Sequence, residues 1–286
     1  MTIRDLRPEG EISMSYYGPH DAVSGTCGEN LTWTLDAEGT LTISGAGDME
    51  NWERIDYGDG YYDCSSVFCN DDRIRHVVIE EGVTSIGDYA FLDCYGLRDV
   101  AIPAGVTRVG KDAFGLCFLL TSVTLPEGVT DIGEGAFSSC YMLQCVRIPG
   151  STVTIGPWAF AISGLLSVEI PGHVTSIGDR AFWECWNLKS IDVAPENRMY
   201  SSREGVLYDK SGQTLLVCPE RKGSEELRPM PRRYERNMRR LMESRRKLET
   251  SDEDAAIPPE DDILEEAEDF YNISDLLEEE TNLFSE

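Results

Sequence analysis

The sequence is short of basic residues and of long apolar runs. It has 25 Lys and Arg against 52 Asp and Glu, which gives a formal net charge of −27. Proteins neutralise nucleic-acid phosphates with Lys and Arg, so this balance argues against direct DNA binding by the folded body and favours a basic protein partner. No segment approaches the roughly 18 consecutive apolar residues of a membrane span. The apolar fraction of 41% is nevertheless large enough for a folded core.

Signatures of metal binding and of secretion are also missing. The chain has only three His, well separated, and no Cys-x-x-Cys pair, so the ligand spacing of a zinc site is absent. Residues 1–18 lack an apolar stretch after their charges, so we expect no secretory signal. Nine cysteines, an odd number, then favour a reducing, cytoplasmic setting. We expect no metal and no cofactor.

Sequence motifs for catalysis are not found. No glycine-rich phosphate loop follows a strand, and no Gly-x-Ser-x-Gly elbow occurs. The many acidic residues do not separate into a catalytic pair on sequence alone. We therefore predict a protein that is not an enzyme, and nothing points to a small-molecule ligand.

What the chain does contain is a motif that recurs five times. It reads GVTSIGDYAFLDC in its first clear copy, and its Phe recurs with a period of 23 residues and one step of 22, at Phe91, Phe114, Phe137, Phe160 and Phe182. A fixed period in this range indicates stacked units rather than a closed domain. Each copy contains a strand L-x-x-V-x-I/L-P, a second short strand V-T-x-I-G, and A-F-x-x-C-x-x-L, which we expect to form one helical turn. Stacking should join equivalent strands into parallel ladders.

Two further rows follow from the repeat. The Gly that ends V-T-x-I-G is expected to adopt an unusual backbone dihedral in a tight turn; this row is Gly87, Gly110, Gly133, Gly156 and Gly178. The Cys three residues after the Phe is expected to be a small buried filler, since Ser163 replaces it in the fourth copy. Metal ligands or disulfides are the alternative for this row, which is Cys94, Cys117, Cys140 and Cys185.

These observations divide the chain into four parts. Residues 1–73 form an N-terminal segment and β cap, in which residues 24–45 alternate apolar and polar residues around a turn and predict a hairpin. Residues 74–193 hold the five repeats. Residues 194–223 form a C-terminal β-hairpin cap, and residues 224–286 are a basic helix followed by an acidic tail.

The repeat resembles the BspA-like leucine-rich repeat family of bacteria, whose repeat runs L-x-x-I-x-I-P-x-x-V-T-x-I-G-x-x-A-F-x-x-C. The resemblance covers about residues 20–222, including SGTCGENLTWTLDAEGTLTISG as an N-terminal cap and NRMYSSREGVLYDKSGQTLLVCPE as a hairpin. It implies an α+β repeat solenoid, more specifically a right-handed leucine-rich-repeat solenoid without enzymatic activity. It also implies binding of host or neighbouring-cell proteins, because many members are secreted surface proteins. The C-terminal tail has no counterpart in the resemblance.

Two surfaces of the solenoid are candidate partner-binding sites. The outward positions of the first strand include Thr124, Arg147, Glu169 and Asp192, with Arg147 expected beside Glu169. Directly after the Cys row, a row of aromatic residues should form a semi-exposed ridge, joined by Trp183 and Trp158. The alternatives are ordinary solvated strand faces and, for the ridge, aromatic side chains that pack on one another as an outer layer. The ridge residues are Tyr95, Phe118, Tyr141, Trp183 and Trp186.

The C-terminal tail is the third candidate. A helix from Tyr234 would align apolar residues on one side and Arg on the other, and Pro258 and Pro259 would end any helix before the acidic segment. That segment is either a solvated, partly disordered terminus or a docking element whose apolar residues enter a groove with a basic rim. A narrower form of the docking hypothesis is that the acidic segment imitates nucleic acid in a basic cleft of its partner. The residues concerned are Ile263, Leu264, Phe270, Tyr271, Ile273, Leu276, Leu277, Leu283 and Phe284.

Taken together, the sequence predicts a non-catalytic protein-interaction module, an adaptor or accessory subunit in a bacterial cytoplasm. It would bind a protein partner through the repeat surface and the acidic tail. One alternative is a surface or secreted adhesin whose export signal lies outside this sequence. Another is an acidic inhibitor or regulator of a nucleic-acid-binding enzyme.

Overall fold

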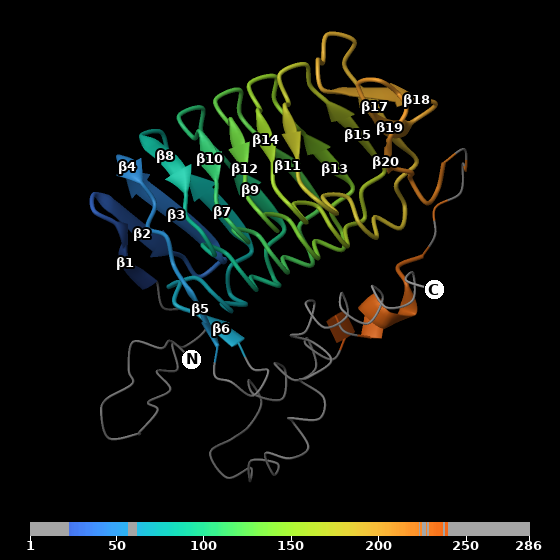
Figure 1. The fold of residues 1–286 in the computed structure, drawn as a ribbon. Coiled ribbons are helices and arrows are strands. Elements are labelled where there is room, and N and C mark those ends of the chain that lie inside the picture. The colour runs from blue at the N-terminus through green and yellow to red at the C-terminus, as the bar shows by residue number, and fades with distance from the viewer. Residues whose placement is uncertain are drawn as a thin grey trace. The chain divides into compact units, whose positions relative to one another are not determined.

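The computed structural model describes residues 23–56, 62–222, 224, 227, 229–236 and 238–239. They belong to two compact units, Met1–Glu53 with Ser65–Met230, and Arg54–Cys64 with Pro231–Glu286. The first unit is a β-solenoid of about five turns, in which short strands of successive copies lie side by side (Figure 1).

The N-terminal cap confirms the predicted hairpin. Strands β1 (Val23–Gly28), β2 (Leu31–Leu35) and β3 (Thr40–Gly45) pair antiparallel in sequence order. The apolar residues of β2 and β3 that face inward are buried: Leu31, Leu35, Leu41 and Ile43. Strand β3 then pairs parallel with the first repeat strand, so the cap supplies the edge on which the repeats stack.

The repeats build two ladders of parallel strands, as the motif predicts. The first strands are β7 (His76–Ile79), β9 (Asp99–Ala101), β11 (Ser122–Thr124), β13 (Cys145–Arg147), β15 (Ser167–Ile170) and β17 (Ser190–Val193). The second strands continue one six-stranded sheet: β4 (Gly47–Asp48), β8 (Val83–Ile86), β10 (Arg108–Val109), β12 (Asp131–Ile132), β14 (Thr154–Ile155) and β16 (Ser176–Ile177). Equivalent residues pair one repeat apart, for example Val109 with Ile132.

The α+β description and the helical turn of each copy are wrong for the described residues. The segment A-F-x-x-C forms a chain of turns, because two residues in each copy adopt the left-handed backbone region and interrupt any helix. One row precedes the Ala-Phe pair: Tyr89, Asp112, Gly135, Trp158 and Arg180. The other directly precedes the Cys position: Asn70, Asp93, Leu116, Ser139, Ile162 and Glu184.

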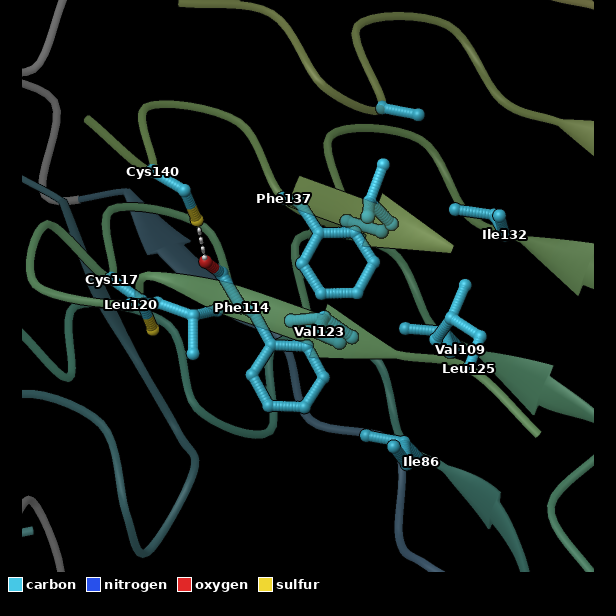
Figure 2. Close-up of a cluster of buried hydrophobic side chains, with 14 of the residues drawn as sticks. Ile86, Val109, Phe114, Cys117, Leu120, Val123, Leu125, Ile132, Phe137 and Cys140 are labelled. Atoms are coloured by element: carbon cyan, nitrogen blue, oxygen red, sulfur yellow. Dashed lines mark hydrogen bonds between the residues drawn. The ribbon is translucent and has the colours of Figure 1, made fainter. Parts of the chain in front are cut away.

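The centre of the solenoid is a column of stacked Phe rings. Phe137 lies between Phe114 and Phe160, with ring centroids 5.2 and 5.5 Å apart and ring planes within 5°. Figure 2 shows the Phe114 and Phe137 rings in the core. Each such pair contributes about 0.5–1.5 kcal/mol beyond the area it buries. The column also includes Phe68, 5.3 Å from Phe91. Phe68 lies one period before Phe91, so the repeat begins one copy earlier than the five that the sequence predicts.

The Gly row is required by close packing and not by its dihedral angles. None of its five members has a positive φ. A Cβ on Gly133 would instead lie 2.6 Å from the backbone carbonyl of Gly110, and one on Gly156 would lie 2.6 Å from the backbone of Gly133. Consecutive copies therefore contact each other backbone to backbone at this position, where any side chain would force them apart.

The Cys row is buried as predicted, and it also forms hydrogen bonds. The Cys140 thiol donates to the carbonyl oxygen of Phe114 at 3.2 Å (Figure 2), and Cys94, Cys117 and Cys185 make the same bond to the Phe one step earlier. In the fourth copy Ser163 is fully buried, 3.3 Å from the Cys185 sulfur. Burial raises the pKa of the Cys185 thiol to about 12, and it raises the pKa of Cys140 further still.

A three-stranded antiparallel sheet closes the C-terminal end of the first unit. Its strands are β18 (Tyr200–Arg203), β19 (Val206–Asp209) and β20 (Leu215–Val217). The sheet is tied to the last repeat strand, since the Ile191 amide donates to the Gly205 carbonyl at 2.8 Å and the Val193 amide to the Ser202 hydroxyl at 3.0 Å. We call this sheet and its turns, residues 194–222, the C-terminal cap.

The second unit has little regular structure among its described residues. Strands β5 (Arg54–Asp56) and β6 (Tyr62–Cys64) form an antiparallel hairpin. Residues 232–236 and 238–239 are helical, with an ion pair of 3.0 Å between Glu235 and Arg239. The remainder of the predicted basic helix lies outside the described residues.

Candidate interaction surface

The first strands present two rows of side chains outward, which we call the strand face. Their inward residues are buried in the core, and the predicted outward residues Thr124, Arg147, Glu169 and Asp192 are all exposed. Pairing in register places Thr124 next to Arg147, and Glu169 next to Asp192. The second outward row consists of His76, Asp99, Ser122, Cys145, Ser167 and Ser190.

Two contacts between side chains of opposite type, one His–Asp and one Arg–Glu, lie on this face. His76 Nδ1 lies 2.8 Å from an Asp99 carboxylate oxygen, one copy further along. The Arg147 guanidinium pairs with Glu127 at 2.8 Å, and no ion pair between Arg147 and Glu169 is found among the described residues. Both side chains of the Arg147 pair are more than 60% exposed, so the pair contributes little to stability.

Glu169 and Asp192 form the most unusual feature of the strand face. They are directly opposite each other in the parallel register of β15 and β17, and both are exposed. Among the described residues no ion pair neutralises either carboxylate, although the Ser190 hydroxyl donates to Asp192 at 3.0 Å. Like charges at adjacent positions cost about 0.2–1 kcal/mol. A cationic group bound at this position would remove that cost.

The predicted aromatic ridge is not exposed. Tyr95, Phe118, Tyr141 and Trp186 are buried, with at most 6% of their surface accessible. The rings pack on one another, with centroid distances of 5.0 Å for Tyr95–Phe118 and 4.5 Å for Phe118–Tyr141. The alternative interpretation, an outer layer of the stack, is therefore confirmed for the position of these four residues. In this conformation they offer no contact area to a partner.

The gap in this aromatic row coincides with the shortened step of the repeat. The fourth copy reads Ser163-Gly164-Leu165 where the third reads Cys140-Tyr141-Met142-Leu143, so Gly replaces the aromatic residue and the segment is one residue shorter. A Cβ on Gly164 would lie 2.6 Å from the Tyr141 carbonyl oxygen. The larger Trp186 of the fifth copy lies next to Tyr141 instead, 6.2 Å away and edge to face.

Trp183 belongs to a different cluster from the other ridge residues. It is half-buried and lies edge to face with Trp158, with centroids 5.6 Å apart. The Arg180 guanidinium lies 4.8 Å from the centre of the Trp158 ring. Sequence analysis missed Arg180, although the repeat carries the signal, since Arg180 occupies the position of Trp158 in the next copy.

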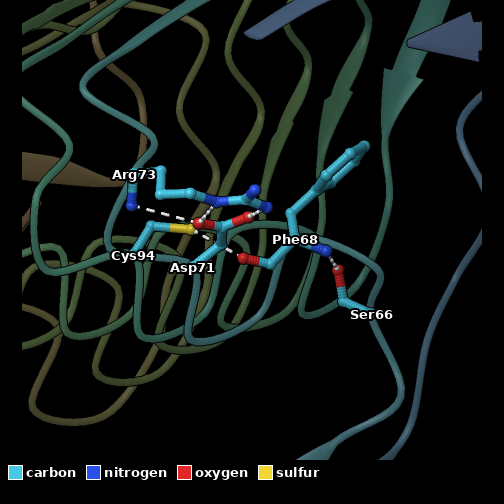
Figure 3. Close-up of polar contacts among 5 residues, drawn as sticks. All are labelled: Ser66, Phe68, Asp71, Arg73 and Cys94. Atoms are coloured by element: carbon cyan, nitrogen blue, oxygen red, sulfur yellow. Dashed lines mark hydrogen bonds and ion pairs between the residues drawn. The ribbon is translucent and has the colours of Figure 1, made fainter. Parts of the chain in front are cut away.

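The first turn of the repeat stack is held by a polar cluster (Figure 3). Arg73 donates through Nε and a terminal nitrogen to both oxygens of Asp71, at 2.9 and 2.6 Å. The Ser66 hydroxyl accepts from the Phe68 amide, and the Cys94 thiol donates to the Phe68 carbonyl at 3.1 Å. Asp71 occupies the Cys position of this earliest copy. The cluster therefore holds together a turn that lacks the usual Cys thiol, and its role is structural.

Other classes of site can be judged only for the described part of the chain. Within it, no group of three or more His, Cys, Asp or Glu is placed to hold a metal ion. No helix there has the length and apolar character of a membrane span. The predicted docking residues of the tail, from Ile263 to Phe284, lie outside the described residues, and their role remains a prediction.

Parallel ladders, a continuous Phe column and capped ends define the class of this protein as a leucine-rich-repeat solenoid. Residues 64–189 match the BspA type leucine rich repeat region in six copies, which agrees with the additional copy at Phe68. Residues 64–189 therefore carry BspA-type leucine-rich repeats. No curated protein matches the sequence.

Solved bacterial structures share the fold. A leucine-rich repeat protein from Eubacterium ventriosum is 25% identical with a TM-score of 0.53, over 71% of this chain and 52% of its own. A leucine rich cell surface protein from Faecalibacterium prausnitzii is 30% identical with a TM-score of 0.44, over 69% and 62%. The pneumococcal vaccine antigen PcpA is 19% identical with a TM-score of 0.50, over 70% and 57%. This chain thus spans less than two thirds of the length of these structures.

Proposed function

We propose that this chain is a non-catalytic protein-interaction module whose strand face binds a protein partner through a basic group. The observation that carries the proposal is the Glu169–Asp192 pair, two adjacent exposed carboxylates for which no cation is provided among the described residues. An Arg or Lys of a partner at this position would gain two charge-assisted hydrogen bonds and relieve the repulsion. The leucine-rich repeat family supports a role in protein interaction but names no partner.

The copy-to-copy variation of the strand face supports the same role. Its outward rows change from Thr124 to Arg147 to Glu169 in consecutive copies, while the inward positions remain aliphatic. Exposed positions on a rigid sheet can vary without cost to the fold, so they are the positions at which specificity can be encoded. An adaptor or accessory subunit needs such a rigid and chemically varied face.

The test compares proteins captured from native lysate by three forms of the full-length chain. Wild type should retain a stoichiometric partner, and a Glu169→Lys/Asp192→Lys variant should lose it. The matched control is Asp131→Lys/Asp179→Lys, which changes the charge equally at two exposed positions outside the strand face. A partner retained by the Glu169→Lys/Asp192→Lys variant would refute the proposal. Loss of the partner with the Asp131→Lys/Asp179→Lys control alone would also refute it.

A further inference from the structure

The C-terminal cap carries an exposed apolar face. Tyr208 of β19 pairs in register with Leu215 of β20, so their side chains lie next to each other on one face of the sheet. The opposite face carries Leu207, which is fully buried. On the near face Val206 is also buried, but Tyr208 is half-buried and Leu215 is exposed, so the accessible part of this face lies at Tyr208 and Leu215. Leu215 is 55% exposed, and Leu216, the additional residue of a β-bulge, is 43% exposed.

An Arg side chain borders these residues. The Arg203 guanidinium lies 5.7 Å from the centre of the Tyr208 ring, and its terminal nitrogen lies close to Gly212. Among the described residues no ion pair joins Arg203 to a carboxylate. The two lysines of the cap, by contrast, are engaged, because Lys222 pairs with Glu204 at 3.0 Å and Lys210 donates to the Asn197 carbonyl. Arg203 is thus a positioned cation without an anion.

This combination distinguishes the cap from other exposed apolar residues of the unit. Val78, in β7, is 37% exposed, and Val153, directly before β14, is 39% exposed. Single exposed aliphatic residues are ordinary on protein surfaces and need no explanation. In the cap, two adjacent leucines, a Tyr ring and an unpaired Arg occur together. Aromatic residues and Arg are the types that contribute most to binding energy at protein interfaces.

We propose that this cap face, formed by Arg203, Tyr208, Leu215 and Leu216, docks an acidic peptide segment rich in large apolar side chains, supplied by a protein partner. A carboxylate of the segment accepts hydrogen bonds from the Arg203 guanidinium, and an adjacent apolar side chain covers the two leucines. The net negative charge of the chain opposes this contact only weakly, because salt screens charges beyond about 8 Å at physiological ionic strength. The cap face and the strand face thus select groups of opposite charge.

The probe is a labelled synthetic peptide with the sequence of residues 260–284, which interleaves acidic and large apolar residues. Its binding is followed by fluorescence anisotropy. The binding protein is the full-length chain with Phe270, Leu276 and Leu277 changed to Ser, so that its own copy of the sequence does not compete. We expect saturable binding. Arg203→Glu and Leu215→Ser/Leu216→Ser should each raise Kd at least tenfold.

Matched variants control for charge and for apolar area. Arg75→Glu and Val153→Ser alter exposed residues on other faces and should leave Kd within twofold. A peptide with its apolar residues replaced by Ser should not bind. Weaker peptide binding by the unsubstituted chain would contradict the assignment to a partner, because it would show that the chain's own segment already occupies the face.

Three further results would overturn the proposal. The first is absence of saturable binding. The second is equal Kd for Arg203→Glu and Arg75→Glu, with circular dichroism showing that both variants are folded. The third is full binding of the Ser-substituted peptide, because the face would then act through charge alone.

Discussion

Within one copy of the repeat, the interior turn and the strand face follow different rules. The Phe position holds Phe in every copy from Phe68 to Phe182, whereas the outward row that contains Thr124 holds a different residue in nearly every copy. An interior side chain contacts its equivalents in the copies before and after it, so a change disturbs two neighbours. An outward side chain contacts mainly water. The repeat therefore separates positions that maintain the stack from positions free to recognise a partner.

The largest effect is expected from opening the Phe column. Phe137→Ala removes a ring that contacts Phe114 and Phe160, and it should lower the free energy of unfolding by about 3–5 kcal/mol. Urea denaturation measures this change. Thr124→Ala on the strand face of the same copy should change the free energy by no more than about 0.5 kcal/mol. Equal effects of the two variants would contradict the separation of interior from face.

A smaller loss is expected where copies meet through their backbones. Gly133→Ala places a methyl group 2.6 Å from the Gly110 carbonyl and should cost about 1–3 kcal/mol. Gly150→Ala is the matched control, because the nearest atom to its Cβ is a Glu127 carboxylate oxygen at 3.6 Å. The control should be neutral or slightly stabilising. If both substitutions were tolerated alike, the Gly row would not be a close contact between copies.

The buried thiols make the interior sensitive to alkaline pH. Burial raises the pKa of Cys140 in the folded chain above its ordinary value of 9.0, so the unfolded chain loses its proton first as pH rises. The stability of wild type relative to Cys140→Ser should be constant below pH 9. Above that it should fall by about 1.4 kcal/mol per pH unit. Denaturation of both proteins from pH 7 to 10.5 gives the difference, and parallel curves would argue against a buried thiol.

The smallest effect is expected on the strand face. Glu169→Gln removes one of two adjacent carboxylates and should stabilise the chain by about 0.2–1 kcal/mol at low salt. The gain should shrink as salt is added, because exposed charges are screened. Glu127→Gln, which breaks the exposed pair with Arg147, should show no comparable gain. A destabilising Glu169→Gln would mean that this carboxylate serves the fold.

Sequence spacing was sufficient to predict the ladders, the period of the Phe residues, the Cys row and the outward residues of the first strands. It was not sufficient for the turns, because residues as different as Tyr89, Leu116 and Glu184 adopt the left-handed backbone there and share no composition. The exposure predicted for the aromatic residues after the Cys was also wrong, because the turn directs the Phe118 side chain against its neighbours. The cap face was missed because Arg203, Tyr208 and Leu215 come together through antiparallel register, which has no period in the sequence.

The row of thiols has a practical consequence. Cys94, Cys117, Cys140 and Cys185 are nearly inaccessible to solvent and occupy the same position of four copies, while Cys145 and Cys218 are exposed. An alkylating reagent should therefore label the two exposed thiols at once and each buried thiol only when its own turn opens. Mass spectrometry of a labelling time course would then report separately the opening of each of these four copies. The buried thiols are therefore built-in probes of the order in which the copies of the solenoid unfold.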